Sequence, residues 1–348
     1  MRRLLAVSAA LVLSGFGTTA LALSAPSAPP AADVCSGPGF RQIGSADAPL
    51  CVHRSFDLPP TDAVTAPLPA KPPTCYGDGE SGARVQLVYG WLQGRPDRSA
   101  TTVPLIRKEV APRMDGLIRS NSPGHDLGIR FAFEAGCRQL SVLRIAFPAS
   151  VAAGSAGRKP EVHLTRMSDH LASLGHSDDN RKYVVMWDEW NEAPVCGIAT
   201  LRSAEDTRDP VNLHDGLYGA DILGLTPKYA VTFARALSPR GPACWLAGRS
   251  GATVPVHELL HTLGAVQLSA PNSDGAGHCL DGPSTMCPNG GTVICQRAPV
   301  EQLDCRRDDY WDPDAKEGSY LAEHRNIARS RFFGPSPLDD LPSLPARS

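Results

Sequence analysis

The stretch VHELLHTLGAVQ, residues 256–267, decides how the fold of this chain is interpreted. His257 and His261 are four residues apart, so a helix places both imidazoles on one face, within reach of one metal ion. Glu258 is offset by one residue and can stand beside a metal-bound water without binding the metal. Gly264 permits the left-handed turn that ends the helix. The alternative is an ordinary amphipathic helix with two surface histidines.

A catalytic zinc site needs a third protein ligand and keeps a fourth position open. Gln267 follows closely, but a neutral amide is a poor zinc ligand beside imidazole or carboxylate. His278 comes after the loop SAPNSDGAG, whose glycines and proline let the chain turn back toward the metal. We therefore expect His257, His261 and His278 to bind one Zn²⁺. The alternative third ligands are Asp281, Asp274 and Gln267.

The motif HELLHTLG, followed by the methionine of STMCP, resembles the metzincin clan of zinc metalloproteases. It is similar above all to a group of secreted bacterial metzincin-like proteins, which share segments like GAVQLSAPNSDGAGHCLDGPSTMC and LDCRRDDYWDPDAKEGSYLAEHRNIARSRFF. The similarity covers residues 75–334 and is strongest over 254–334. The resemblance implies a zinc endopeptidase in which Glu258 is the general base and Met286 forms an apolar floor beneath the ligands.

The chain departs from the metzincin pattern at two places. Metzincins usually have a third ligand, His or Asp, six residues after the second histidine, and Gln267 stands there in this chain. Family members often have a tyrosine shortly after the turn methionine, where this chain has Cys287 and Pro288. Tyr310 is the substitute candidate for stabilising the oxyanion.

Hydrophobic patterning predicts an α/β fold of the α+β type. Strands are predicted over residues 84–91, 128–136, 140–148, 181–190 and 195–201, and helices over 103–120 and 160–175; residues 228–237 suit either. The order predicts a metzincin-like mixed sheet with crossover helices. The helix that carries the HExxH motif, residues 257–261, follows this sheet. A loop-rich C-terminal subdomain that is cross-linked by disulfides comes after it. Residues 195–201 are a candidate edge for pairing with an extended substrate.

The predicted domain organisation begins with export. Residues 1–22 have the charged, apolar and small-residue order of a signal peptide, so we expect a secreted, extracellular protein without membrane contact after cleavage. Residues 23–74 form a Pro/Ala-rich N-terminal segment or pro-region. Residues 75–334 are the metalloprotease-like catalytic domain, and 335–348 are a Pro-rich tail.

The chain has ten cysteines, an even number that indicates disulfides in an exported protein. Pairing neighbours in order is the simplest expectation: Cys35 with Cys51, Cys75 with Cys137, Cys196 with Cys244, Cys279 with Cys287, and Cys295 with Cys305. Thiolate metal ligation is the rival interpretation, although no two cysteines have the spacing of a zinc knuckle. In that case Cys35 or Cys51 is a pro-region thiol that blocks the zinc.

The net charge of −2 is nearly balanced, and the sequence shows no basic footprint typical of nucleic-acid binding, so no nucleic-acid partner is expected. The expected partner is a protein or peptide substrate, and the expected state is a monomer. Asp304, Asp308 and Asp309 are a candidate calcium site, because carboxylates at short spacing suit Ca²⁺. A solvated acidic loop is the alternative.

These observations predict a secreted, zinc-dependent endopeptidase that hydrolyses peptide bonds through a zinc-activated water with Glu258 as general base. Two alternatives remain. One is a zinc-binding extracellular interaction module with weak or no activity. The other is a zinc hydrolase of non-peptide amides or esters.

Overall fold

The computed structural model describes residues 40–45, 48–53, 71–154, 157–201, 228–241, 243–245, 253–282, 284–287 and 302–335. All of these belong to one compact unit, Val34–Ser348. The predicted signal peptide lies outside the described residues, as does the tail beyond residue 335. Within the described part, no helix has both the length and the apolar character needed to cross a bilayer.

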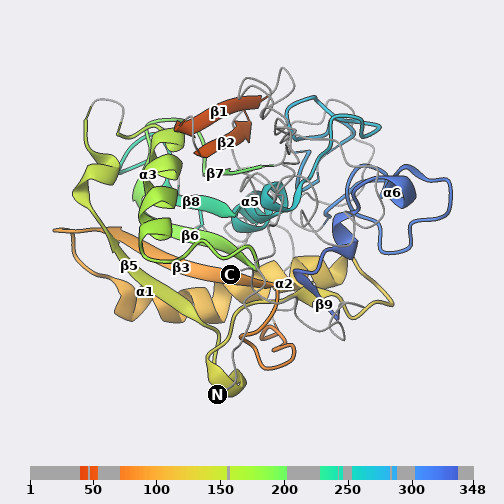
Figure 1. Cartoon of the computed structure of the whole chain (residues 1–348), viewed down its shortest axis with the longest axis horizontal. Coiled ribbons are helices and arrows are strands. Elements are labelled where there is room, and N and C mark those ends of the chain that lie inside the picture. The colour runs from red at the N-terminus through yellow and green to blue at the C-terminus, as the bar shows by residue number, and fades with distance from the viewer. Residues whose placement is uncertain are drawn as a thin grey trace, which may run out of the picture. The chain divides into compact units, whose positions relative to one another are not determined.

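A five-stranded sheet with the strand order β5-β3-β6-β8-β7 forms the centre of this unit (Figure 1). β3 (Arg84–Leu92), β5 (Val142–Phe147), β6 (Arg181–Trp190) and β8 (Tyr229–Arg235) pair in parallel. β7 (Gly197–Ala199) pairs antiparallel with β8 and is the last strand on that side. The predicted mixed sheet is therefore present.

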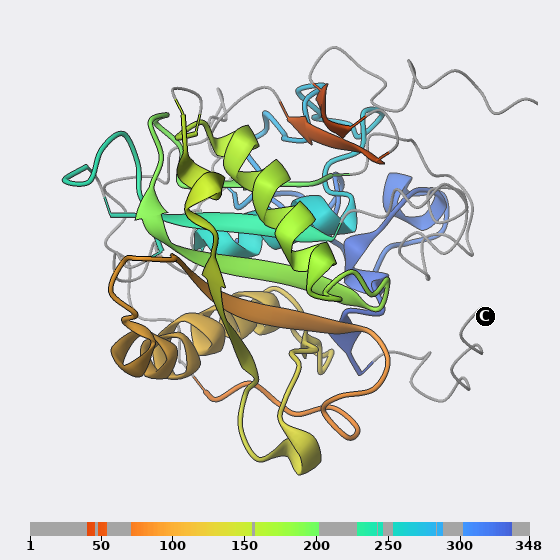
Figure 2. The same cartoon turned by 60° about the vertical axis from the view of Figure 1, so that its left-hand side comes forward.

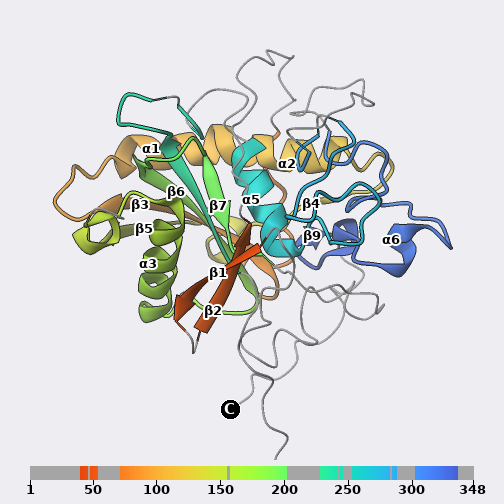
Figure 3. The same cartoon turned by 90° about the horizontal axis from the view of Figure 1, so that it is seen from above.

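Helices cover both faces of the sheet, as Figures 2 and 3 show. α3 (Pro160–Ser173) packs on one face, with the even-numbered side chains of β3 such as Val88 and Leu92. On the other face, odd-numbered β3 side chains share a core with α1 (Ser99–Leu105), a π-helical turn (Ile106–Val110), α2 (Ala111–Ser120) and α5 (Thr253–Leu263). Alternating strand residues thus divide the apolar core into two layers.

The predicted helix over 103–120 is longer and less regular than expected. It begins at Ser99, and a π turn separates α1 from α2, where the Ala111 N–H donates to the Ile106 carbonyl. Pro112 explains the interruption, because it has no N–H to donate and its ring crowds the preceding turn.

The predicted strand over 128–136 is mostly irregular. Only β4 (Gly128–Ile129) forms, paired with β9 (Phe333–Gly334). The residues that follow make isolated bridges to two different segments, Phe131 with Val85 and Phe133 with Leu140, before the chain turns at Gly136, which has a φ of +71°. The segment 228–237, which suited either type, contains strand β8.

The remaining elements are short. β1 (Phe40–Ser45) and β2 (Ala48–His53) form a hairpin, in which Val52 is buried beside the α3 face of the sheet. Part of the Pro/Ala-rich segment therefore packs with the main unit. The others are the 3₁₀ turns Ala135–Cys137, Ala149–Ala152 and Ile327–Arg329, and the one-turn helix α6 (Tyr320–Glu323).

Three disulfides confirm the predicted pairing of neighbouring cysteines: Cys75–Cys137, Cys196–Cys244 and Cys279–Cys287. Cys51 and Cys305 are also disulfide-bonded, and their expected partners lie outside the described residues. Thiolate ligation is therefore wrong for these eight cysteines. Cys51, in particular, is not a thiol that blocks a metal.

Lys182 connects the sheet to the C-terminal end of α5. Its buried Nζ donates to the Thr262 carbonyl at 2.9 Å and lies 5.1 Å from the centre of the Phe332 ring. A cation at a helix C-terminus is favoured by the helix dipole. This contact fixes the position of the C-terminal end of α5 relative to β6.

We predict that Lys182→Met lowers the free energy of unfolding by about 1–3 kcal/mol, because it removes a buried donor from a backbone carbonyl. Urea denaturation of the disulfide-intact protein measures the change. Lys108→Met is the matched control, since Lys108 is exposed and should change stability by less than about 0.5 kcal/mol. Equal losses in the two variants would contradict this role.

Candidate metal centre

α5 places His257, Glu258 and His261 in the interior of the protein. Every residue of the helix is buried, and Val256, Leu259, Leu260 and Leu263 pack into the core shared with α1 and α2. The helix begins at Thr253 and tolerates Pro255 in its first turn. Gly264 then takes a φ of +94°, as the sequence predicts, and its missing side chain leaves room for Arg325.

Three imidazoles converge at this helix. His257 Nε2 lies 3.1 Å from His261 Nε2 and 3.3 Å from His278 Nε2, and ring nitrogens of all three residues lie within 4.8 Å of one another. In a tetrahedral site with Zn–N bonds of about 2.0–2.1 Å, ligand nitrogens are about 3.3–3.4 Å apart. The observed separations therefore fit three ligands of one zinc ion.

The opposite ring nitrogens face oxygen acceptors. His257 Nδ1 lies 2.7 Å from the Thr285 carbonyl, His261 Nδ1 lies 3.3 Å from the Ala265 carbonyl, and His278 Nδ1 lies 3.6 Å from Asp274 Oδ2. A carbonyl only accepts hydrogen bonds, so these contacts favour the tautomer with hydrogen on Nδ1. The Nε2 lone pairs then point toward the shared centre, which is the usual arrangement of metal-binding histidines.

A tightly bonded loop holds His278 in this position. Asp274 Oδ1 accepts hydrogen bonds from the backbone N–H groups of Ala276 and His278, at 2.7 and 3.0 Å. Burial alone would raise the pKa of Asp274, but its contacts with His278 and the two N–H groups lower it below the ordinary value. The disulfide Cys279–Cys287 closes the loop next to His278, as the sequence predicts.

Glu258 packs against the edge strand β7. It is buried, and a Cβ added at Gly197 would lie 2.4 Å from Glu258 Oε1 and 2.5 Å from its Cγ. Only glycine leaves this space at position 197. Sequence inspection did not single out Gly197, because its importance arises from a contact between distant segments.

The alternative third ligands lie elsewhere. Gln267 Oε1 accepts a hydrogen bond from the Arg325 N–H at 3.1 Å, which gives this side chain a structural role. Asp274 Oδ2 lies 3.6 Å from Nδ1 of His278. Asp281 belongs to a separate group with Asp309 and the Cys279–Cys287 disulfide. Apart from these candidates, the ring of His324 stacks on Tyr320, with ring centres 4.0 Å apart.

Met286, in the turn of the STMCP motif, and Tyr310 are both buried in the core. Met286 is fully buried in the same core as α5. The Tyr310 hydroxyl donates to the Leu303 carbonyl and accepts from the Met286 N–H. These bonds occupy the hydroxyl, so Tyr310 fixes the turn and is a poor candidate for the oxyanion role.

No family model matches this chain, and a search of curated proteins finds no similar sequence. The interpretation of the site therefore depends on its geometry and on the sequence motif.

We predict that the purified protein binds about one zinc ion per chain and that His278→Ala loses most of it, because two imidazoles hold zinc far more weakly than three. Elemental analysis after dialysis against a mild chelator measures the content. His324→Ala is the matched control and should keep its zinc, as should Gln267→Ala. Full zinc content in His278→Ala would exclude His278 as a ligand.

Proposed function

We propose that the protein is an exported, zinc-dependent endopeptidase of the metzincin type, acting on proteins or peptides. The observation that carries this proposal is the convergence of the His257, His261 and His278 Nε2 atoms beside Glu258 on the same helix. The five-stranded, mostly parallel sheet supports it, as do the disulfides typical of exported proteins.

The donor set suits zinc. His257, His261 and His278 would hold the ion, and three neutral nitrogen ligands with an open fourth position are typical of catalytic zinc. When bound, Zn²⁺ supplies Lewis-acid chemistry that lowers the pKa of water to about 7 and polarises a carbonyl group.

Glu258 performs the proton transfers in the proposed reaction. Its carboxylate accepts a proton from the attacking water and delivers it to the leaving amine. Because the side chain is packed against Gly197, its position is fixed before substrate arrives. A base held in place in this way avoids the cost of reorganisation during the reaction.

β7 gives the proposed enzyme a place to bind an extended peptide. Among the described residues it is the terminal strand of the sheet, and its residue Gly197 contacts Glu258. A peptide that adds to this edge through main-chain hydrogen bonds would lie beside the general base. This arrangement favours hydrolysis within a peptide chain.

Hydrolysis of casein and quenched fluorescent peptides tests the proposal. We predict that Glu258→Gln lowers kcat by a factor of about 10²–10⁴ while zinc content stays unchanged, because only the proton acceptor is removed. Glu323→Gln, at an exposed glutamate, is the matched control and should retain full activity.

The results also separate the alternatives. Turnover of small amides or esters without cleavage of any peptide would indicate a hydrolase of non-peptide substrates. Stoichiometric zinc without turnover of any substrate would indicate an interaction module. Either result would contradict the endopeptidase proposal.

We further predict that Gly197→Ala lowers kcat at least tenfold without loss of zinc, because the added methyl group displaces the Glu258 carboxylate from its packed position. Parallel zinc analysis and peptide kinetics separate this effect from unfolding. If Gly197→Ala kept wild-type kcat, the β7 contact would have no part in positioning Glu258.

A further inference from the structure

A second group of potential metal ligands lies apart from the three histidines. Asp304, Asp308 and Asp309 offer carboxylate oxygens that are all within 4.8 Å of one another, and Asp309 has the same relation to Asp281. The sequence had pointed to the first three; the fold adds Asp281, which is distant in sequence.

Several oxygens in this group have no donor. Asp304 Oδ2 accepts the backbone N–H groups of Asp309, Tyr310 and Trp311 at 3.1, 2.7 and 2.9 Å. Its other oxygen, Oδ1, is buried and has no hydrogen-bond partner among the described residues; the same is true of Asp281 Oδ2 and Asp308 Oδ1. Asp304 is only 2% exposed and Asp281 only 4%, so bulk water does not satisfy these atoms.

The charge in this group is poorly balanced. Burial raises the pKa of Asp304 to about 7 and that of Asp309 to about 6. Burial, together with Asp308, also raises the pKa of Asp281. Arg306 lowers the pKa of Asp281 and Asp308, but its side chain is exposed and screened by solvent. Buried carboxylates this close together normally share a cation or a proton.

We propose that Asp281, Asp304, Asp308 and Asp309 bind a calcium ion, which fastens the His278 loop to the segment that contains residues 304–311. An all-oxygen set of carboxylates suits a hard cation such as Ca²⁺. Cys279 and Cys287 are close to Asp281 and Asp309, but their disulfide offers no thiolate for zinc. The proposal does not depend on peptidase activity.

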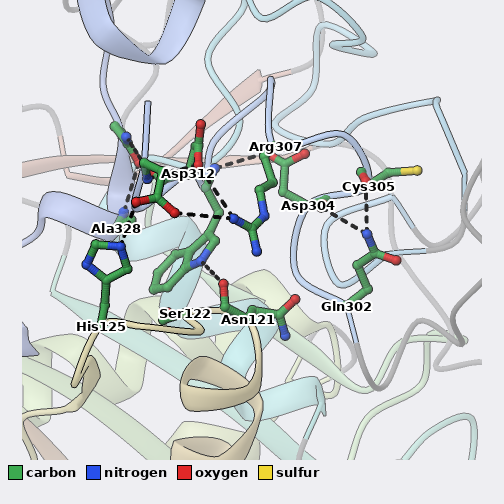
Figure 4. A network of polar contacts seen from close by, with 12 residues as sticks. Asn121, Ser122, His125, Gln302, Asp304, Cys305, Arg307, Asp312 and Ala328 are labelled. Atoms are coloured by element: carbon green, nitrogen blue, oxygen red, sulfur yellow. Dashed lines mark hydrogen bonds and ion pairs between the residues drawn. The ribbon is translucent and has the colours of Figure 1, made fainter. Parts of the chain in front are cut away.

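The segment that supplies three of the carboxylates is held in place before any ion binds. Figure 4 shows Asp304 and Asn121 within one polar network. Gln302 Nε2 donates to the Asp304 carbonyl at 3.2 Å, and Asn121 Oδ1 accepts the Leu303 N–H at 3.1 Å. Asn121 immediately follows α2, so the network ties residues 302–311 to the core.

The opposite side of the proposed site is the His278 loop. The Asn272 N–H donates to Asp309 Oδ1 at 2.8 Å, and the Asn272 carbonyl accepts the Leu280 N–H at 2.9 Å. Asp281 follows Leu280 directly and lies three residues after His278. A cation between Asp281 and the 304–309 carboxylates would therefore restrict the loop that carries the third histidine.

Calorimetric titration of the zinc-loaded, full-length protein with CaCl₂ tests the proposal. We expect about one Ca²⁺ per chain and a Tm increase of about 5 °C or more at saturation. Asp308→Asn should abolish both effects while the protein stays folded, because Asp308 is only partly buried. Asp314→Asn is the matched control, since that carboxylate is 60% exposed and outside the group. The variant Asp281→Asn should likewise lose both calcium binding and the Tm increase.

A second readout locates the ion. Tb³⁺ in place of Ca²⁺ should show luminescence sensitised by Trp311, whose backbone N–H contacts Asp304, and Asp308→Asn should lose it. Calcium should also slow zinc transfer to a chromogenic chelator at least several-fold in the wild type but not in Asp308→Asn. No calcium heat and no Tb³⁺ luminescence in the wild type would overturn the proposal, as would equal calcium binding by the wild type and Asp308→Asn.

Discussion

The arrangement of the whole site depends on one physical constraint: three imidazole nitrogens face one another at hydrogen-bond distance inside the protein. His257 Nε2 lies 3.1 and 3.3 Å from the Nε2 atoms of His261 and His278. Oxygen acceptors lie on the opposite side of each ring, which favours hydrogen on Nδ1. In that tautomer the three Nε2 atoms are all acceptors and would repel one another. A cation at their centre would convert this repulsion into three favourable bonds.

The surrounding fold keeps these nitrogens together. α5 is buried along its entire length, and Lys182 binds its last turn from the sheet. The third histidine comes from a loop, which is less rigid by itself, and Asp274 and the Cys279–Cys287 disulfide restrain it. A cation bound by Asp281 and the 304–309 carboxylates, as proposed above, would be a further restraint on the same loop. Two metal ions would then serve different purposes, one in chemistry and one in holding a ligand.

The sequence predicted those parts of the site that depend on local spacing, and it did not predict those that depend on contacts between distant segments. His257 and His261 are four residues apart, so helix geometry alone predicts that both lie on one face. His278 was chosen on ligand chemistry, and the structure brings it to the same centre. By contrast, the space that Gly197 leaves for Glu258 depends on contacts across the fold that no local pattern records. The strand predicted over 128–136 was wrong for most of its length for a similar reason. After Ile129 the chain forms isolated bridges with two distant segments, at Val85 and Leu140, instead of one continuous ladder.

The most direct test of the central claim is anomalous diffraction from crystals of the zinc-loaded protein, recorded on both sides of the zinc absorption edge. We predict one strong anomalous peak about 2.0–2.1 Å from each of the Nε2 atoms of His257, His261 and His278. A peak bonded to only two of these imidazoles, with Gln267 or a carboxylate as the third ligand, would contradict the claim. So would the absence of any peak beside α5.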